Sequence, residues 1–154
     1  MPADASATLP LPFPLDLELT LGPLRRGPSD PTIRFEPNGV WRAARTPDGP
    51  ATLRLQHGGD RMVAEAWGAG AHWLIAHVPP LLGFDDRPES FKPASRLLWD
   101  LHRHHAGLRL GRTGLVFEAL LPTILEQKVP SVEAYASYAR LVRALGEAAP
   151  GDAG

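Results

Sequence analysis

Residues 32–67 read TIRFEPNGVWRAARTPDGPATLRLQHGGDRMVAEAW, and this stretch decides the expected fold. Runs rich in aliphatic, aromatic and β-branched residues alternate with turn sequences. Asn38-Gly39 is a strong hairpin signal because both positions accept positive φ, and glycine-containing turns follow at 46–50 and 58–60. This spacing predicts an antiparallel meander, with strands at 32–35, 40–45, 51–57 and 61–67.

The residues that precede the meander divide into two parts. Residues 1–14 are rich in Pro and Ala and lack periodicity, which predicts a flexible lead-in. From Leu15 to Leu21, leucine alternates with Asp, Glu and Thr. A period of two is typical of a half-buried strand, and Gly22-Pro23 would end it.

Helical periodicity replaces the strand pattern after residue 70. Trp73, Leu74, Ile75 and Val78 fit one stripe of a short helix, which we expect Pro79-Pro80 to end. Residues 84–93 are polar and rich in helix breakers, so we interpret them as a linker.

Three more helices are predicted beyond the linker. The first contains Leu97, Leu98 and Leu101, with Ser95 as its N-cap. The second runs from about residue 113 to 127, with Pro122 inside it as the cause of a kink. The third begins with Ser131 as N-cap and ends at Gly146.

The expected fold class is therefore α+β, with an antiparallel sheet and its helices followed by the start of an all-helical domain. The predicted organisation is a lead-in at 1–14, an antiparallel β/α domain at 15–83, a linker at 84–93, a partial helical domain at 94–147 and a frayed tail at 148–154.

Composition excludes several classes of protein. With 44% hydrophobic and 21% charged residues, the 154-residue chain is typical of globular proteins. No apolar run approaches the ~20 residues of a membrane-spanning helix, and no secretory signal is recognisable. The absence of cysteine excludes disulfides and thiol catalysis. We expect a cytoplasmic location and no membrane partner.

Charge is distributed unevenly along the chain. The overall net charge is −1, which gives no general attraction to nucleic acid. Residues 1–86 carry seven Arg and ten acidic residues, whereas residues 87–128 carry seven Arg or Lys and four acidic residues. If the chain contacts a phosphate backbone, the segment 87–128 is the favoured part.

Histidine and tryptophan offer alternative sites that the sequence disfavours. His102, His104 and His105 lack the i, i+4 spacing of a helical zinc site, so we expect solvated or capping histidines, no metal and no cofactor. The four tryptophans could form a base-stacking set, but their apolar neighbours favour core packing. They are Trp41, Trp67, Trp73 and Trp99.

Residues 113–146 read TGLVFEALLPTILEQKVPSVEAYASYARLVRALG. The Phe-Glu-Ala-Leu of 117–120, the Ile-Leu-Glu-Gln of 124–127, the following Val129 and the Ala- and Arg-rich helix resemble the opening of the helix-hairpin-helix DNA glycosylase domain. The preceding strands are similar to the N-terminal β/α domain of 3-methyladenine-DNA glycosylase II, which is like half of a TATA-binding-protein fold. The amino-acid sequences of residues 19–32 and 40–55 resemble those of the actinobacterial branch of this family.

This resemblance implies base-excision repair by base flipping, in which an alkylated purine is extruded from double-stranded DNA and removed. In the family, the loop after the Ile-Leu-x-Gln helix enters the minor groove, and it maps here to Gln127, Lys128 and Val129. Arg112 is a further candidate for phosphate contact, because it precedes a helix N-terminus.

Two departures qualify the assignment of this loop. Many relatives have glycine where this chain has Glu126, and an apolar wedge where it has Lys128. A lysine neutralises phosphate but intercalates poorly. Gln127 has an alternative role, in which it satisfies carbonyl groups at the end of its helix.

The family's catalytic residues find no match in these 154 residues. The hairpin motif and the essential Asp of the family follow the matched segment, so no catalytic residue is assigned and the chain alone is predicted to be inactive. The alternative hypothesis is a non-catalytic α+β module that binds DNA or a protein.

Overall fold

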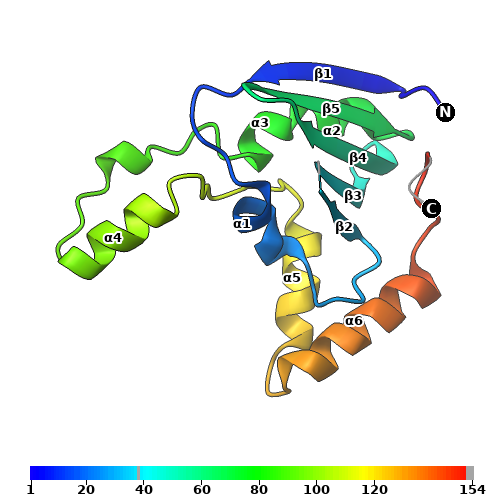
Figure 1. Cartoon of the computed structure of the whole chain (residues 1–154). Coiled ribbons are helices and arrows are strands. Elements are labelled where there is room, and N and C mark those ends of the chain that lie inside the picture. Colours follow the sequence, from blue (N-terminus) through cyan, green and yellow to red (C-terminus); the bar gives the residue numbers. More distant parts are fainter. Residues whose placement is uncertain (38, 152–154) are drawn as a thin grey trace.

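The computed structural model describes residues 1–37 and 39–151, which form an α+β fold around one antiparallel sheet (Figure 1). The strand order is β1-β5-β4-β3-β2. The predicted fold class is confirmed. The strands are β1 (Ala5–Pro10), β2 (Ile33–Glu36), β3 (Gly39–Thr46), β4 (Gly49–His57) and β5 (Arg61–Trp67).

Strands β2 to β5 form the predicted meander, within one or two residues of the expected bounds. Glu36 pairs with Gly39 in the first hairpin; Asn38 of the predicted turn lies outside the described residues. In the second hairpin Thr46 pairs with Gly49, and its hydroxyl donates to the Gly49 carbonyl at 2.9 Å. Gly49 has a φ of 124°, which a residue with a side chain rarely adopts.

The prediction of a flexible lead-in at 1–14 is wrong, because Ala5–Pro10 forms the edge strand β1. This strand runs antiparallel to β5, with Ala5 opposite Ala66 and Pro10 opposite Arg61. Ala5 and Leu9 pack against the core. Since small alanines occupy core-facing positions, the alternation is too weakly hydrophobic to be recognised in the sequence.

The predicted strand at 15–21 is also wrong. Leu17–Leu21 forms the short helix α1, and the 3₁₀ helix η1 (Gly22–Leu24) continues it. Asp16 is the N-cap, and its carboxylate accepts from the Leu19 N–H at 2.9 Å. Leucines two apart are also four apart, so the same pattern fits one side of a helix, where Leu17 and Leu21 meet the core.

Helices α2 (Ala71–Ala76) and α3 (Val78–Leu81) cover one face of the sheet (Figure 1). The predicted helix is present as α2, but it ends at Ala76, ahead of Pro79-Pro80, and Val78 of the predicted stripe belongs to α3. Both prolines lie in the first turn of α3, where an N–H has no helical partner and proline is tolerated. The core formed between these helices and the sheet includes Leu21, Val40, Leu53, Leu55, Met62, Leu74, Val78 and Leu82.

The second half of the chain contains the 3₁₀ helix η2 (Pro88–Ser90), then α4 (Arg96–His104), α5 (Val116–Leu125) and α6 (Ser131–Leu145). Ser95 caps α4 as predicted, since its hydroxyl accepts from the Leu98 N–H at 3.3 Å. The N-cap of α6 is Pro130 rather than the predicted Ser131, which is the first helical residue. Gly146 ends α6 as predicted. No helix in the described ranges is long and apolar enough to cross a membrane.

The tail is not frayed throughout its predicted range. A Cβ atom placed on Gly68 would lie 2.4 Å from Pro150, and one on Gly151 would lie 2.7 Å from the Trp67 ring, so residues 150–151 pack against the sheet. The remaining residues, 152–154, lie outside the described part. Core packing holds for Trp67, which is 4% exposed, and fails for Trp99, which is 48% exposed on α4.

An ion pair joins the sheet to the helices of the second half. Arg42 lies on β3, with its side chain 4% exposed on the core-facing side. One guanidinium nitrogen, Nη2, donates to both carboxylate oxygens of Glu118 on α5, at 2.6 and 2.7 Å. A buried guanidinium needs such a partner because its desolvation is costly.

We expect Glu118→Ala to lower the free energy of unfolding by about 2–4 kcal/mol, since it leaves Arg42 buried without a counter-charge. Urea denaturation measures this change. Glu65→Ala is the matched control: Glu65 pairs with Arg54 on the opposite sheet face, where both side chains are 32% exposed. Its loss should cost less than about 1 kcal/mol. Equal losses in the two variants would contradict a special role for the Arg42–Glu118 pair.

Candidate nucleic-acid interface

The loop between α5 and α6 forms a protruding tip at the lower end of the molecule (Figure 1). The Glu126 N–H donates to the Pro122 carbonyl at 2.9 Å, and the Gln127 N–H donates to the Ile124 carbonyl at 3.3 Å. Lys128 then adopts a φ of 61°, the one positive φ among the described non-glycine residues. This left-handed residue ends the helical turn and reverses the chain into α6.

Gln127, Lys128 and Val129 are all exposed, and Val129 is 42% exposed. The predicted loop residues are therefore contiguous at the tip. They present a cation beside an apolar side chain, with the N-terminus of α6 directly after them. A left-handed conformation at lysine is costly, and such strain is concentrated at functional sites.

Glu126, at the base of the loop, has a partner elsewhere in the chain. Its carboxylate lies 3.7 Å from an Arg26 guanidinium nitrogen, and both side chains are partly buried. The Arg26 N–H donates to the Asp30 carboxylate at 2.6 Å. The segment before β2 therefore holds the end of α5. The local sequence pattern does not indicate this contact, because the two residues are a hundred positions apart.

Arg112 lies at the opposite end of α5 from the loop. Its N–H donates to the Pro80 carbonyl at 3.0 Å, and its guanidinium bonds the Asp85 carboxylate at 2.8 Å. Ten residues of α5 separate the two positions, a helix length of about 15 Å. The structure thus does not bring Arg112 to the loop, although the side chain remains 59% exposed.

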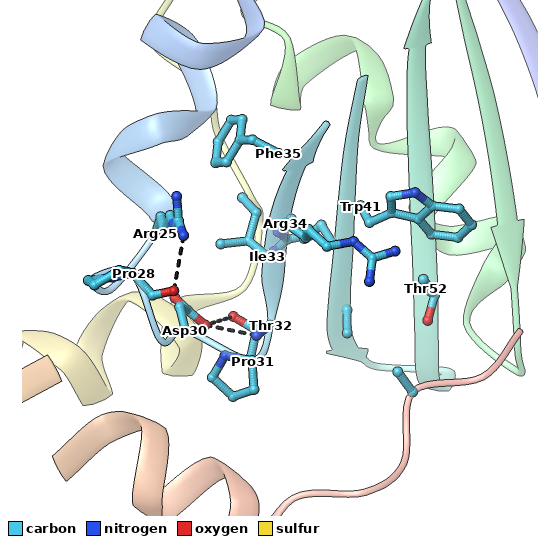
Figure 2. A pocket seen from close by; sticks show the side chains of 13 residues that line it. Arg25, Pro28, Asp30, Pro31, Thr32, Ile33, Arg34, Phe35, Trp41 and Thr52 are labelled. Atoms are coloured by element: carbon cyan, nitrogen blue, oxygen red, sulfur yellow. Dashed lines mark hydrogen bonds between the residues drawn. The ribbon is translucent and has the colours of Figure 1, made fainter. Parts of the chain in front are cut away.

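A cavity of about 300 Å³ beside β2 gathers arginines that sequence analysis did not combine (Figure 2). These charges are already engaged. Arg25 donates to the carbonyls of Gly27 and Pro28, and Arg34 lies 3.3 Å from Glu36 and over the ring of Trp41. The cavity therefore offers phosphate less free charge than its arginine content suggests.

Tyr138 on α6 adds a polar contact between α6 and the segment before β2. It is 7% exposed. Burial raises its pKa above the ordinary value of 10.0, a hydrogen bond with Thr32 lowers it, the charges of Asp30 and Glu118 raise it, and Arg26 lowers it. Asp30 in turn accepts from the Thr32 hydroxyl at 2.6 Å, as Figure 2 shows. Tyr138 is thus a positioning contact for α6 rather than a surface residue.

The histidines form no metal centre in the described ranges, where no three His, Cys, Asp or Glu side chains are close enough to hold an ion. A ring nitrogen of His104 lies 2.7 Å from the Asp100 carbonyl, which is a capping contact at the end of α4. His102 packs edge-on against Phe91, with their ring centroids 5.6 Å apart.

No family model matches this chain, and no curated protein has a significantly similar sequence. Among solved structures, the fold of this chain is similar to that of about half of a DNA glycosylase. The particular neighbour is a 3-methyladenine DNA-glycosylase from Archaeoglobus fulgidus, with a TM-score of 0.71 and 21% sequence identity. The match covers 96% of this chain and 53% of the neighbour, so the chain spans about half the length of that protein.

Above about pH 10, we expect the free energy of unfolding to fall more steeply with pH in the wild type than in Tyr138→Phe. The raised pKa keeps Tyr138 neutral in the folded state at a pH where the unfolded chain already ionises it. Its contribution is therefore complete below pH 10 and is lost as pH rises toward the folded-state pKa. Urea denaturation between pH 8 and 11 measures the difference, with Tyr135→Phe on the same helix as control. Parallel wild-type and Tyr138→Phe profiles would contradict this prediction.

Proposed function

We propose that this chain is the N-terminal, DNA-contacting portion of a base-excision repair glycosylase that flips and removes alkylated purines. The observation that carries the proposal is the fold, which matches a 3-methyladenine DNA-glycosylase over 96% of the chain. The loop at 127–129 supports it, because it is exposed between α5 and α6, where the family resemblance leads us to expect a DNA contact.

The chemistry of the loop suits a phosphate backbone better than a base stack. Lys128 supplies one positive charge on a flexible stem, and its charge lies close to the N-terminus of α6, which favours anions. Val129 is the apolar side chain nearest to it in sequence. We infer that Lys128 contacts phosphate and that Val129 takes the place nearest to the base stack.

The described residues supply a scaffold rather than a complete active site. The face of α5 exposes Val116, Phe117, Leu120 and Ile124, by 80, 73, 49 and 54%. A groove of about 640 Å³ lies between β3, α5 and α6. Apolar surface of this kind normally requires a cover. We propose that further helices of a glycosylase domain cover it and carry the catalytic Asp.

The first test is binding to duplex DNA containing 3-methyladenine or an abasic-site analogue. We expect weak binding that falls steeply with salt, and a several-fold loss in Lys128→Glu, since the charge reversal removes one phosphate contact and adds repulsion. Lys92→Glu is the matched control, because Lys92 is the other lysine of the chain and lies in the linker. Equal effects of the two substitutions would contradict the loop assignment.

The second test is release of base from alkylated DNA by the purified chain. We expect none above the rate without protein, because no residue of the chain matches the family's catalytic Asp. Release of alkylpurine above the rate without protein would contradict the proposal that this portion is non-catalytic. If the chain showed neither DNA binding nor base release, the alternative of a protein-binding module would be favoured.

A further inference from the structure

The sheet face opposite to α2 and α3, which we call the outer face, carries a pair of stacked indoles. Trp41 on β3 and Trp67 on β5 meet across the intervening strand β4, with their ring centroids 5.3 Å apart and their planes inclined by 21°. Trp67 is 4% exposed, although it is not part of the core between the sheet and the helices. Chain segments outside the sheet therefore cover this side of the indole pair.

The segment 147–151, with the sequence Glu-Ala-Ala-Pro-Gly, provides part of this cover. Pro150 packs against Gly68, and Gly151 packs against the ring of Trp67, so closely that neither glycine has room for a Cβ atom. Surfaces formed by aromatic side chains are typical binding sites for extended segments that contain proline. The segment thus lies on the outer face in the way that a bound peptide would.

The segment leaves part of this site unfilled. Ala149 lines the cavity of about 300 Å³ beside β2, and Trp41 and Thr52 line the same cavity (Figure 2). The methyl group of Ala149 is exposed and reaches little of this volume. A cavity of this size accommodates a much larger group. An occupant with a longer side chain at the place of Ala149 would therefore fill the site better than the chain's own segment does.

The Thr52 hydroxyl shows what kind of side chain the cavity favours. Thr52 is 0% exposed, and its Oγ1 has no hydrogen-bond partner within the described part of the chain. By contrast, the hydroxyl of the buried Thr46 donates to the Gly49 carbonyl at 2.9 Å. Leaving a buried hydroxyl without a partner is costly, so an occupant that bonds Thr52 gains affinity.

An uncharged amide suits this hydroxyl better than a charged group. A hydroxyl both donates and accepts, and the amide of Asn or Gln offers both a donor and an acceptor. A charged side chain would have to leave water for a cavity whose arginines already have partners. Arg25 donates to two carbonyls, and Arg34 lies 3.3 Å from Glu36. Desolvation without a new counter-charge disfavours such an occupant.

We propose that the outer face binds a partner protein through an extended segment in which Asn or Gln directly precedes Pro-Gly. The Pro-Gly takes the places of Pro150 and Gly151, and the amide replaces the methyl group of Ala149 and bonds the Thr52 hydroxyl. A second copy of this chain is disfavoured as the source, because its segment also has alanine at this place. This inference does not depend on the proposed DNA repair function.

The test uses three labelled peptides of about ten residues with identical flanks, which contain Ala-Asn-Pro-Gly, Ala-Gln-Pro-Gly or Ala-Ala-Pro-Gly. Fluorescence anisotropy follows each peptide during titration with the full chain carrying Gly151→Ala. This substitution places a Cβ atom 2.7 Å from the Trp67 ring and so displaces the chain's own segment. We expect an amide peptide to bind at least about fivefold more tightly than the alanine peptide, as one added hydrogen bond implies.

Gly59→Ala is the matched control for opening the site. Gly59 also has a positive φ, but a Cβ atom on it would contact nothing within 4 Å. The chain's own segment therefore stays in place in this variant and competes with the peptide at a high effective concentration. We expect the amide peptide to bind Gly59→Ala at least about tenfold more weakly than Gly151→Ala.

A second substitution tests the role of the hydroxyl. In the Gly151→Ala background, Thr52→Val removes the hydroxyl while keeping the shape of the side chain. We expect the preference for the amide peptide to fall below about twofold, with binding of the alanine peptide unchanged. Thr8→Val, at an exposed position of β1 outside the cavity, should leave the preference intact. Circular dichroism and thermal melts of each variant establish that the fold is retained.

Several outcomes would overturn the proposal. These are no binding of any peptide, equal binding of the amide and alanine peptides, or a preference that survives Thr52→Val. Light scattering that shows a wild-type dimer dissociated by the peptide would assign the outer face to a second copy. Displacement of the peptide by a single-stranded oligonucleotide would assign it to nucleic acid. Thr52→Val should leave duplex binding unchanged, so failure of this proposal is distinguishable from failure of the proposed function.

Discussion

The buried Arg42 guanidinium is the constraint on which the arrangement of the two halves depends. It lies on the core-facing side of β3, where a charge without a partner would be strongly destabilising. Glu118 satisfies it from α5, and the nearby Asp30, Thr32 and Tyr138 add polar contacts between the segment before β2 and α6. Because hydrogen bonds are directional, these contacts set the position of the helices more narrowly than apolar packing would. By positioning α5 and α6, these contacts also fix the position of the exposed loop at 127–129.

The parts of the fold that sequence analysis predicted are those in which local chemistry and tertiary packing agree. The meander from Ile33 to Trp67 has glycine turns and strands rich in aliphatic, aromatic and β-branched residues, and the Ser95 cap has a local hydrogen bond. The two segments whose secondary structure was predicted wrongly, β1 and α1, have ambiguous sequence patterns. Small alanines conceal an edge strand, and leucines two apart fit a helix as well as a strand. Trp99 shows a third limit, because an apolar residue on a helix need not meet a core within the same chain.

In the candidate site, too, one feature could be predicted from the local sequence and another could not. The position of the loop at Gln127 follows from the end of a helix, a feature that the sequence contains. The Arg26–Glu126 pair does not, since it joins residues a hundred positions apart. The two neighbouring residues therefore differ in physical character: Glu126 is tied to the body of the molecule, whereas Lys128 is exposed.

The packing of residues 150–151 on Trp67 has a practical consequence. The indole N–H of the same tryptophan donates to the Met1 carbonyl at 3.3 Å, and its ring stacks on Trp41 at 5.3 Å. Residue 1 and residue 151 thus meet at a single indole. An affinity tag or fluorescent-protein fusion attached at either end would disturb the same chromophore. The fluorescence of that tryptophan pair would in turn report whether a given fusion leaves the sheet intact.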